Sequence, residues 1–244
     1  RHRVVCVHGK EKVEAVELTK LPATSISLFK NKNKNIVSDS LLVGHGLVPS
    51  LEITRLLKAE HLFQPDRGGW IPKLDKFQCT TVSGLYVAGD CGGISGAHTA
   101  VLSGEIAGLH AAFDIGMISE NLFTALYKSV QKKRQKTESF GKKMAKLMSM
   151  RSELLEGLSP ETIVCRYEDI TFGQIMEALK GGATDCNEVK AWTRSGMGPC
   201  QGRTCGETIS EIVSGHIGNR EKAGFWTARV PLRPCSIDAL APIC

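Results

Sequence analysis

The sequence lacks three features that would each define a class of protein. It has no run of about 18 consecutive apolar residues, so no segment is suited to span a bilayer as a helix. Its formal net charge is only +6 over 244 residues, which argues against strong nucleic-acid binding. Its nine cysteines are too widely scattered for a small secreted disulfide scaffold. We therefore expect a cytoplasmic protein with no transmembrane segment and no nucleic-acid partner.

The residues that are present have the composition of an ordinary globular protein. A hydrophobic content of 42% over this length predicts a well-buried core and two compact units. Val4 to Leu18 is typical of two strands joined by a turn around Gly9, and Leu51 to Ala59 has the pattern of a short helix. This layout favours an α/β sheet.

The stretch from Thr81 to Phe113 predicts a strand, a glycine-rich turn and a helix. Leu85 to Ala88 is a short apolar run of the kind found in strands that are buried on both faces. Such a strand ends where a parallel sheet presents its carboxyl edge to a ligand, and the next helix would point its N–H groups there. The candidate ligand-binding residues are Gly89, Asp90, Gly92, Gly93, Gly96 and Ala97.

A second apolar run lies earlier in the chain, at Leu41 to Val43. It is followed by Gly44-His45-Gly46, and Pro49 prevents immediate continuation as a helix. The pattern predicts another buried strand that breaks into a ligand-facing turn, so Gly44 and His45 are further candidates. A hydrogen-bonded structural role for His45 stays the alternative, because no partner residue is visible beside it.

Thr81 followed by an apolar strand that ends in Gly89-Asp90 resembles the second flavin-binding motif of two-dinucleotide-domain flavoproteins. The resemblance implies FAD as the cofactor, with Asp90 hydrogen-bonded to a ribityl hydroxyl. The Gly46 to Pro49 turn is similar to the place where such chains return from the nicotinamide-type domain to the flavin domain. The alternative is an ordinary parallel strand whose aspartate caps the following helix, since Asp is a favoured N-cap residue.

The first-half fingerprint of a dinucleotide site does not occur before Thr81. No predicted strand there is followed by Gly-x-Gly-x-x-Gly, the pattern that holds a pyrophosphate. We therefore expect the chain to supply only part of a cofactor site. The missing N-terminal half would carry the fingerprint, either on the same polypeptide before Arg1 or as a separate chain.

Ser119 to Leu158 predicts one long or two shorter helices with an interrupted apolar stripe. Its other faces are basic, and we expect this segment to act as a linker. Contact with an acidic partner is one interpretation of its lysines and arginines, and a solvated helix face is the other.

Cysteines mark the segment that begins at Thr162. Cys200 and Cys205 stand four residues apart in a glycine-rich loop that is flexible enough to bring two thiolates to one metal centre. Cys165 precedes the first predicted helix, and an αα-hairpin would bring it toward them. Helix N-termini lower thiolate pKa values, as a metal ligand requires.

This segment resembles the bacterioferritin-associated-ferredoxin-like [2Fe–2S] domain. Joined to the flavin motif, TRSGMGPCQGRTCG and the tail from Phe225 to Pro234 resemble the α-subunits of opine oxidases, hydrogen cyanide synthase and related amino-acid dehydrogenases. The resemblance implies FAD, a [2Fe–2S] cluster and a partner β-subunit, which is an amine-oxidising flavoprotein. It assigns no catalytic side chain to this chain, whose part is to bind cofactor and pass electrons on.

One departure from that family pattern affects the cluster. Tyr167 stands where a second cysteine is expected, so three of the four ligand positions match: Cys165, Cys200 and Cys205. Cys186 is the candidate for the fourth ligand. Alternatively, the cluster has been lost and the fold kept, or the thiols hold zinc with another ligand.

These observations predict the C-terminal part of a two-dinucleotide-domain flavoprotein, with a parallel sheet and helices, followed by a small all-α helical-hairpin domain. The function expected is that of an FAD-dependent electron-transferring subunit in a dehydrogenase or oxidase that acts on amino acids, opines or secondary amines. The alternative is a non-catalytic scaffold module that docks a partner. The expected segments are 1–35, the end of the nicotinamide-type domain; 36–118, the FAD-binding part; 119–160, the basic linker; 161–218, the cluster-type domain; and 219–244, the tail.

Overall fold

The computed structural model describes residues 2–20, 33–44, 46–148, 155 and 157–241. It divides into two compact units, as its length predicts: Arg1–His45 with Arg151–Glu156, and Gly46–Met150 with Gly157–Cys244. None of the helices among the described residues has the length and apolar character needed to cross a membrane.

The first unit is a three-stranded antiparallel sheet in the order β1-β2-β3. Its strands are β1 (His2–His8), β2 (Ala15–Lys20) and β3 (Lys34–Val37). The predicted turn after β1 is confirmed, since Gly9 has a φ of 138° and the Glu14 N–H donates to the His8 carbonyl at 2.9 Å. Valine and isoleucine side chains pair across this sheet, with Val16 opposite both Val7 and Ile36. Gly44 belongs to this unit, whereas His45 lies outside the described residues.

The second unit begins with a helix and a hairpin: α1 (Glu52–Leu56), β4 (His61–Gln64) and β5 (Gly69–Pro72). The hairpin is antiparallel, and its turn is a 3₁₀ helix over Pro65–Arg67 that ends at Gly68, a residue in the left-handed conformation. The predicted helix in this region is confirmed by α1, which is shorter than expected.

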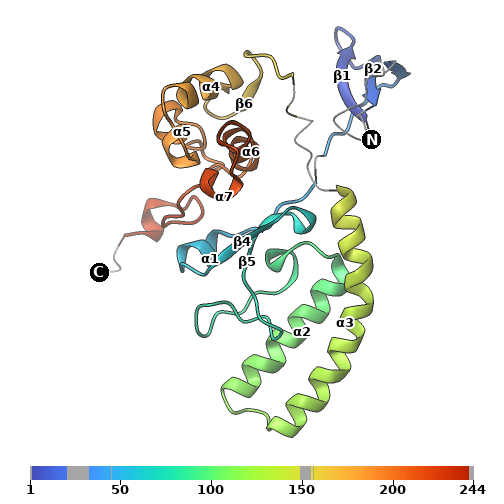
Figure 1. The fold of residues 1–244 in the computed structure, drawn as a ribbon, viewed down its shortest axis with the longest axis vertical. Coiled ribbons are helices and arrows are strands. Elements are labelled where there is room, and N and C mark those ends of the chain that lie inside the picture. Colours follow the sequence, from blue (N-terminus) through green and yellow to red (C-terminus); the bar gives the residue numbers. More distant parts are fainter. Residues whose placement is uncertain (1, 21–32, 45, 149–154, 156, 242–244) are drawn as a thin grey trace. The chain divides into compact units, whose positions relative to one another are not determined.

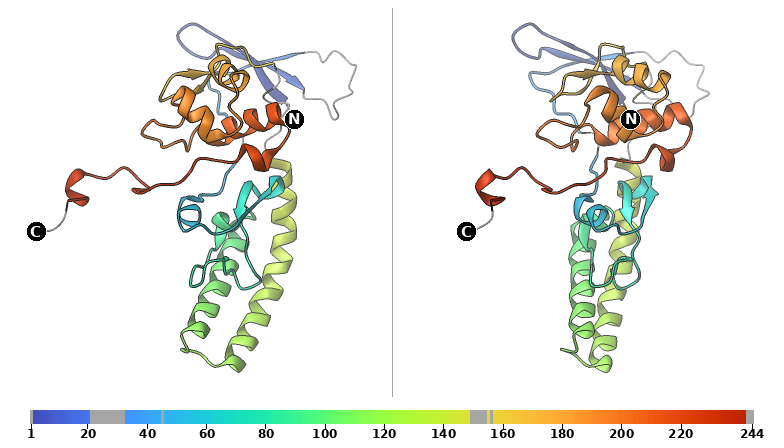
Figure 2. Two further views of the ribbon diagram at one scale, coloured as in Figure 1. Left: turned by 60° about the vertical axis from the view of Figure 1, so that its left-hand side comes forward. Right: turned by 90° about the vertical axis from the view of Figure 1, so that its left-hand side faces the viewer.

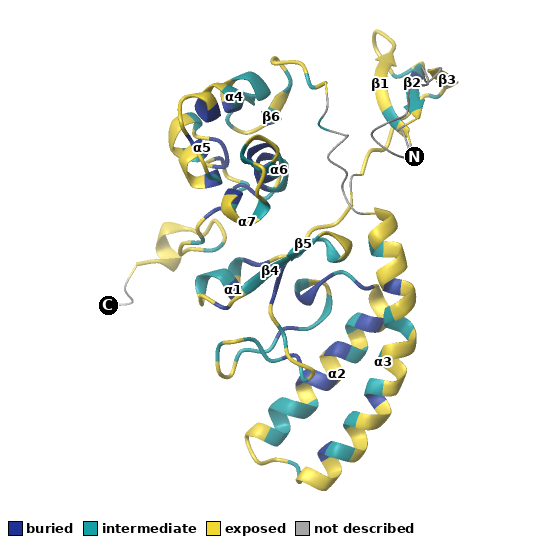
Figure 3. Ribbon diagram, in the orientation of Figure 1, coloured by how far each residue is buried: buried dark blue, intermediate teal, exposed yellow. Residues whose placement is uncertain are grey.

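Two long helices follow, α2 (Ala97–Asp114) and α3 (Glu120–Met148), and they run side by side in each view (Figures 1 and 2). Aromatic rings from α2, α3 and the preceding loop gather where the two helices pack: Phe77 stacks on His110, and Phe123 meets His110 edge to face. Exposed residues cover most of α3, with buried positions recurring along its length (Figure 3). Residues 120–148 of the segment expected to be a linker therefore form one long helix that packs on α2.

The strand predicted at Leu85 to Ala88 is wrong, and the parallel sheet expected around it is not among the strand pairs of the described residues. This segment forms a single antiparallel bridge, from Tyr86 to Cys79, and every strand pair that is described is antiparallel. A parallel ladder needs neighbouring strands, which the described part of the chain does not supply. The mixed α/β class itself is confirmed.

The C-terminal part is mainly helical, as predicted, with one short hairpin in addition. Its elements are β6 (Ile163–Cys165), β7 (Ile170–Thr171), α4 (Phe172–Lys180), α5 (Cys186–Thr193), α6 (Gly206–Ile217), α7 (Arg220–Ala223) and a 3₁₀ turn over Ile237–Ala239. Thr171 and Gln174 form a capping box at the start of α4, and Asp185 caps α5. Ile175, Val189 and Ile209 are fully buried and join α4, α5 and α6 into one core.

Candidate functional site

The turn between the Tyr86 segment and α2 is built on backbone conformations that favour glycine. Gly89 and Gly93 have φ angles of 72° and 113°, and a 3₁₀ helix over Gly89–Gly92 links them. A Cβ atom at Gly93 would stand 2.6 Å from the Arg67 Nε, so a larger residue there would also displace the Arg67 guanidinium. The sequence therefore specifies this turn locally.

Arg67 fixes the turn to the β4–β5 hairpin. Its guanidinium donates to the Gly92 carbonyl at 2.9 Å, and its own carbonyl accepts from the Ile94 N–H at 2.9 Å. Burial lowers the pKa of Arg67, an effect that the Glu138 carboxylate opposes and Arg134 adds to. The turn is thus held beside two arginine side chains, which favour an anionic group nearby.

The predicted site residues of this turn come together in two places. Gly89, Asp90, Gly92 and Gly93 line one depression of about 10 Å³, which has room for a single water molecule. Gly96 and Ala97 stand beyond it, exposed, at the beginning of α2. The turn is therefore suited to form one wall of a cofactor site and does not enclose a cofactor by itself.

Asp90 does not cap α2, which overturns the structural alternative for this residue. The N-cap residue is Gly96, and no side chain accepts a hydrogen bond from the first turn of this 18-residue helix. Asp90 is exposed, and its carboxylate has no hydrogen-bond partner among the described residues. Both the carboxylate and the first N–H groups of α2 are left available to a ligand.

Three of the four candidate cysteines lie near one another. Cys165 ends β6 and Cys205 precedes α6, and both are buried, with 1% and 2% of their surface exposed. Burial and the neighbouring Cys165 and Cys200 raise the pKa of the Cys205 thiol to about 12. Burial alone would raise the pKa of Cys200, but backbone N–H groups of the loop from Gly202 to Thr204 lower it.

Cys186 is not brought to these three thiols. Its sulfur lies 3.6 Å from the Gly224 carbonyl, and burial raises its pKa to about 11. Tyr167 does adjoin the cysteine loop, because a Cβ atom at Gly198 would stand 2.4 Å from the Tyr167 Cβ. The described residues thus group three thiols and no fourth, which does not fit the four thiolates that a [2Fe–2S] cluster normally takes.

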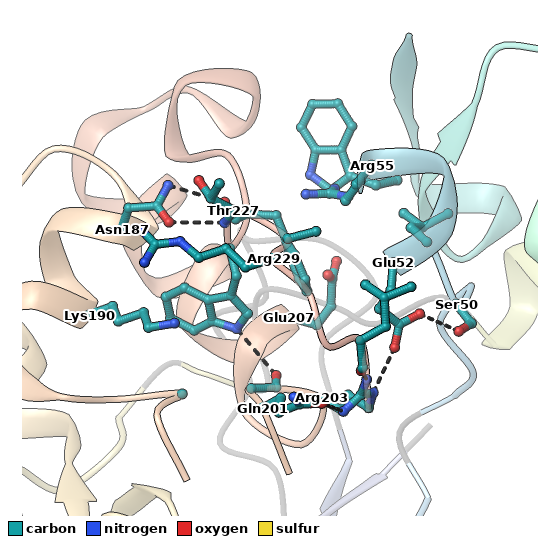
Figure 4. Close-up of a pocket in the computed structure, with 18 of the residues that line it drawn as sticks. Ser50, Glu52, Arg55, Asn187, Lys190, Gln201, Arg203, Glu207, Thr227 and Arg229 are labelled. Atoms are coloured by element: carbon teal, nitrogen blue, oxygen red, sulfur yellow. Dashed lines mark hydrogen bonds and ion pairs between the residues drawn. The ribbon is translucent and has the colours of Figure 1, made fainter. Parts of the chain in front are cut away.

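Sequence reasoning missed a cavity of about 810 Å³ among the described residues (Figure 4). It lies between α1, β5, α5, the cysteine loop and the tail. Glu52 and Arg203, 151 residues apart, form an ion pair of 2.6 Å at its edge. Burial raises the pKa of Glu52, but hydrogen bonds from Ser50 and Arg203 outweigh it and lower the value to about 2.

Arg55 is one of the charged residues that line this cavity. Its guanidinium lies 4.5 Å from the Phe225 ring centroid and 5.7 Å from that of Trp70. Burial lowers its pKa to about 10, against the attraction of Glu207. The Nε of Arg55 and the Nε1 of Trp70 are buried without a hydrogen-bond partner in the described structure. In the sequence, the only signal for this cavity was the occurrence of arginine and aromatic residues in α1, β5 and the tail.

Comparison with known proteins identifies relatives for both halves of the chain. Residues 1–104 match the pyridine nucleotide-disulphide oxidoreductase family, and residues 159–242 match the sarcosine oxidase A3 domain. The chain is 31% identical over 242 residues to the A subunit of opine oxidase from Rhizobium meliloti, a match that covers 99% of this chain and 44% of that protein. It is 27% identical over 258 residues to hydrogen cyanide synthase subunit HcnB of Pseudomonas protegens, at 99% and 52% coverage.

A solved structure shares the fold. The crystal structure of L-proline dehydrogenase from P. horikoshii superposes with a TM-score of 0.73 at 23% identity, over 98% of this chain and 44% of that one. The chain spans about half the length of the relatives that it matches.

Proposed function

We propose that this chain is part of an FAD-dependent oxidoreductase subunit. It belongs to the flavoprotein family that includes the A subunit of opine oxidase and the HcnB subunit of hydrogen cyanide synthase. Its substrates would be amino acids, opines or related secondary amines. The amine would be oxidised on a partner β-type flavoprotein subunit, and this chain would help to carry the electrons away. FAD, when bound, supplies the redox chemistry.

The observation that carries this proposal is the glycine turn at the open N-terminus of α2. Asp90 is exposed and without a partner among the described residues, so it can accept a hydrogen bond from a ribityl hydroxyl. The uncapped first turn of α2, which begins at Ala97, offers N–H groups and a partial positive charge to a phosphate. Arg67 and Arg134 add positive charge beside the same depression.

The residues of this chain act by orientation and electrostatics. Gly89, Gly92, Gly93 and Gly96 allow close approach of the cofactor, and Arg67 keeps the turn in place through the Gly92 carbonyl. Gly44 and His45 remain proposed cofactor-binding residues of the first unit. No side chain of the turn is proposed as a general acid or base.

The cysteines have no step in this mechanism. Cys165, Cys200 and Cys205 supply three thiols, and Tyr167 at the fourth position is a poor ligand because a phenol oxygen is harder than a thiolate sulfur.

The experiment replaces Asp90 with alanine in the complete natural protein and measures the FAD released on denaturation. Loss of one hydrogen bond to a charged group, about 1.5 to 3 kcal/mol, should weaken FAD binding tenfold or more. Glu105→Ala, which removes an exposed carboxylate further along α2, is the matched control. Equal FAD content in both variants and the natural protein would place the cofactor elsewhere.

A second candidate function, docking of a partner, is favoured by the cavity of about 810 Å³. Five basic and two acidic side chains line it, with the aromatic rings of Trp70, Phe225 and Trp226. This excess of positive charge suits an acidic segment of the partner subunit. Arg55→Met should then weaken binding of the purified partner, whereas Arg194→Met, on the exposed end of α5, should not. Equal binding by the two variants would exclude the cavity as the docking site.

A further inference from the structure

A thiol, an imidazole and a carboxylate converge on the sheet of the first unit. Cys6 and His8 stand two residues apart on β1, so their side chains share a face. Glu17 on β2 is the register partner of Cys6. One potential ligand atom from each residue lies within 4.8 Å of the other two, and no other His, Cys, Asp or Glu triplet in the described part of the chain meets this condition.

This cluster occupies the polar face of the sheet. Val7, Val16 and Ile36 pair on the opposite face, where Val16 is only 4% exposed. Cys6 is exposed and 46% of the His8 side chain is accessible, so an ion can reach them from solvent. The apolar face is the one suited to packing, which leaves the cluster open.

The geometry of Glu17 is set by a neighbour. The Asn33 amide donates to the Glu17 Oε1 at 2.8 Å, while Oε2 lies 3.8 Å from the His8 Nε2. Zinc binds nitrogen and oxygen at roughly 2.0 to 2.2 Å and sulfur at roughly 2.3 Å, so ligand atoms of one tetrahedral ion are separated by roughly 3.3 to 3.8 Å. The three donors are therefore already near the required spacing, and Asn33 orients one of them.

We propose that Cys6, His8 and Glu17 bind one transition-metal ion of the zinc class. A thiolate, an imidazole and a carboxylate form a donor set typical of Zn²⁺ or Co²⁺, whereas Ca²⁺ and Mg²⁺ take oxygen ligands. The Cys6 thiol releases its proton to solvent as the metal–sulfur bond forms, and water fills the fourth position. The ion joins β1 to β2 and stabilises the pair, independently of flavin binding.

The test titrates the metal-free full chain with Co²⁺ and counts the ions bound by equilibrium dialysis, with the thiolate-to-cobalt absorption band as a second readout. Cys165, Cys200 and Cys205 are a separate possible site, so the decisive quantity is the number of ions that a variant loses. Cys6→Ser, His8→Gln and Glu17→Gln should each lose one ion. Cys235→Ser, at another exposed cysteine, should lose none.

Two further variants separate a built site from simpler binding. Asn33→Ala should keep the ion but weaken its binding about tenfold, because it removes only the group that orients Glu17. If Cys6→Ser abolishes binding while His8→Gln and Glu17→Gln both retain full affinity, the ion is bound by a lone surface thiol and the proposal is overturned. Unchanged ion counts in all three ligand variants would overturn it too. Circular dichroism establishes that each variant is folded before it is scored.

Discussion

Gly141 lies where α3 touches Ser95, in the turn before α2, and replacing it with alanine should destabilise the protein. A Cβ atom there would stand 1.9 Å from the Ser95 carbonyl oxygen and 2.6 Å from its carbon, well inside van der Waals contact. The contact is to backbone, so no side-chain rotation relieves it. Overpacking of this kind costs about 1 to 3 kcal/mol or more, partly offset by the gain of about 1 kcal/mol from replacing a helical glycine with alanine.

Gly104 on α2 supplies the matched control, because the same substitution there should have the opposite sign. It is exposed, and an added Cβ meets nothing within 4 Å, so Gly104→Ala should stabilise the helix by about 0.5 to 1 kcal/mol. Urea unfolding followed by circular dichroism compares the two variants with the natural sequence. The proposed packing of α3 against the turn is refuted if Gly141→Ala is as stable as Gly104→Ala.

Three other predictions rest on single contacts. Iodoacetamide should modify Cys200 before Cys186 and Cys205, because burial raises the pKa values of the latter two thiols to about 11 and about 12. Mass spectrometry of a time course at neutral pH measures the order of modification, and equal rates would contradict the prediction. The lowered pKa of Glu52 adds stability that is complete above the unfolded pKa of about 4.5 and is lost as pH falls toward 2. Glu52→Gln should remove about 1 kcal/mol of this pH-dependent stability, measured by urea titrations at pH 3 and pH 7. Identical pH profiles of the variant and the natural protein would exclude this contribution of Glu52. Thr171→Ala breaks the capping box of α4 and should lower the stability of the helix by about 1 kcal/mol. Amide exchange in the first turn of α4 should become faster, and unchanged exchange there would mean that the cap contributes nothing.

Local signals account for what the sequence predicted correctly. The β1–β2 pair turns at Gly9 because a single glycine supplies the positive φ, and the C-terminal helices begin at cap residues that a few positions specify. The strand expected at Leu85 to Ala88 failed because an apolar run becomes a strand only when neighbouring backbones complete its ladder.

The ion pair between Glu52 and Arg203 could not be predicted, because the two residues are 151 positions apart and no local sequence pattern around either one indicates its partner. The cavity at Arg55 has the same origin, since its walls come from α1, β5, α5 and the tail. Whether Cys186 reaches the other thiols was equally open, and packing of α5 against Gly224 decided against it.

The sequence by itself determined the backbone of the turn at Asp90 and the spacing of Cys200 and Cys205, because glycine conformation and chain separation depend on a few neighbouring residues. Tertiary structure alone decided that Gly96, not Asp90, is the N-cap residue of α2, that Cys6, His8 and Glu17 share one face, and that Arg55 lies against two aromatic rings. These juxtapositions follow from strand register and helix packing, which bring distant segments together through contacts that no short stretch encodes.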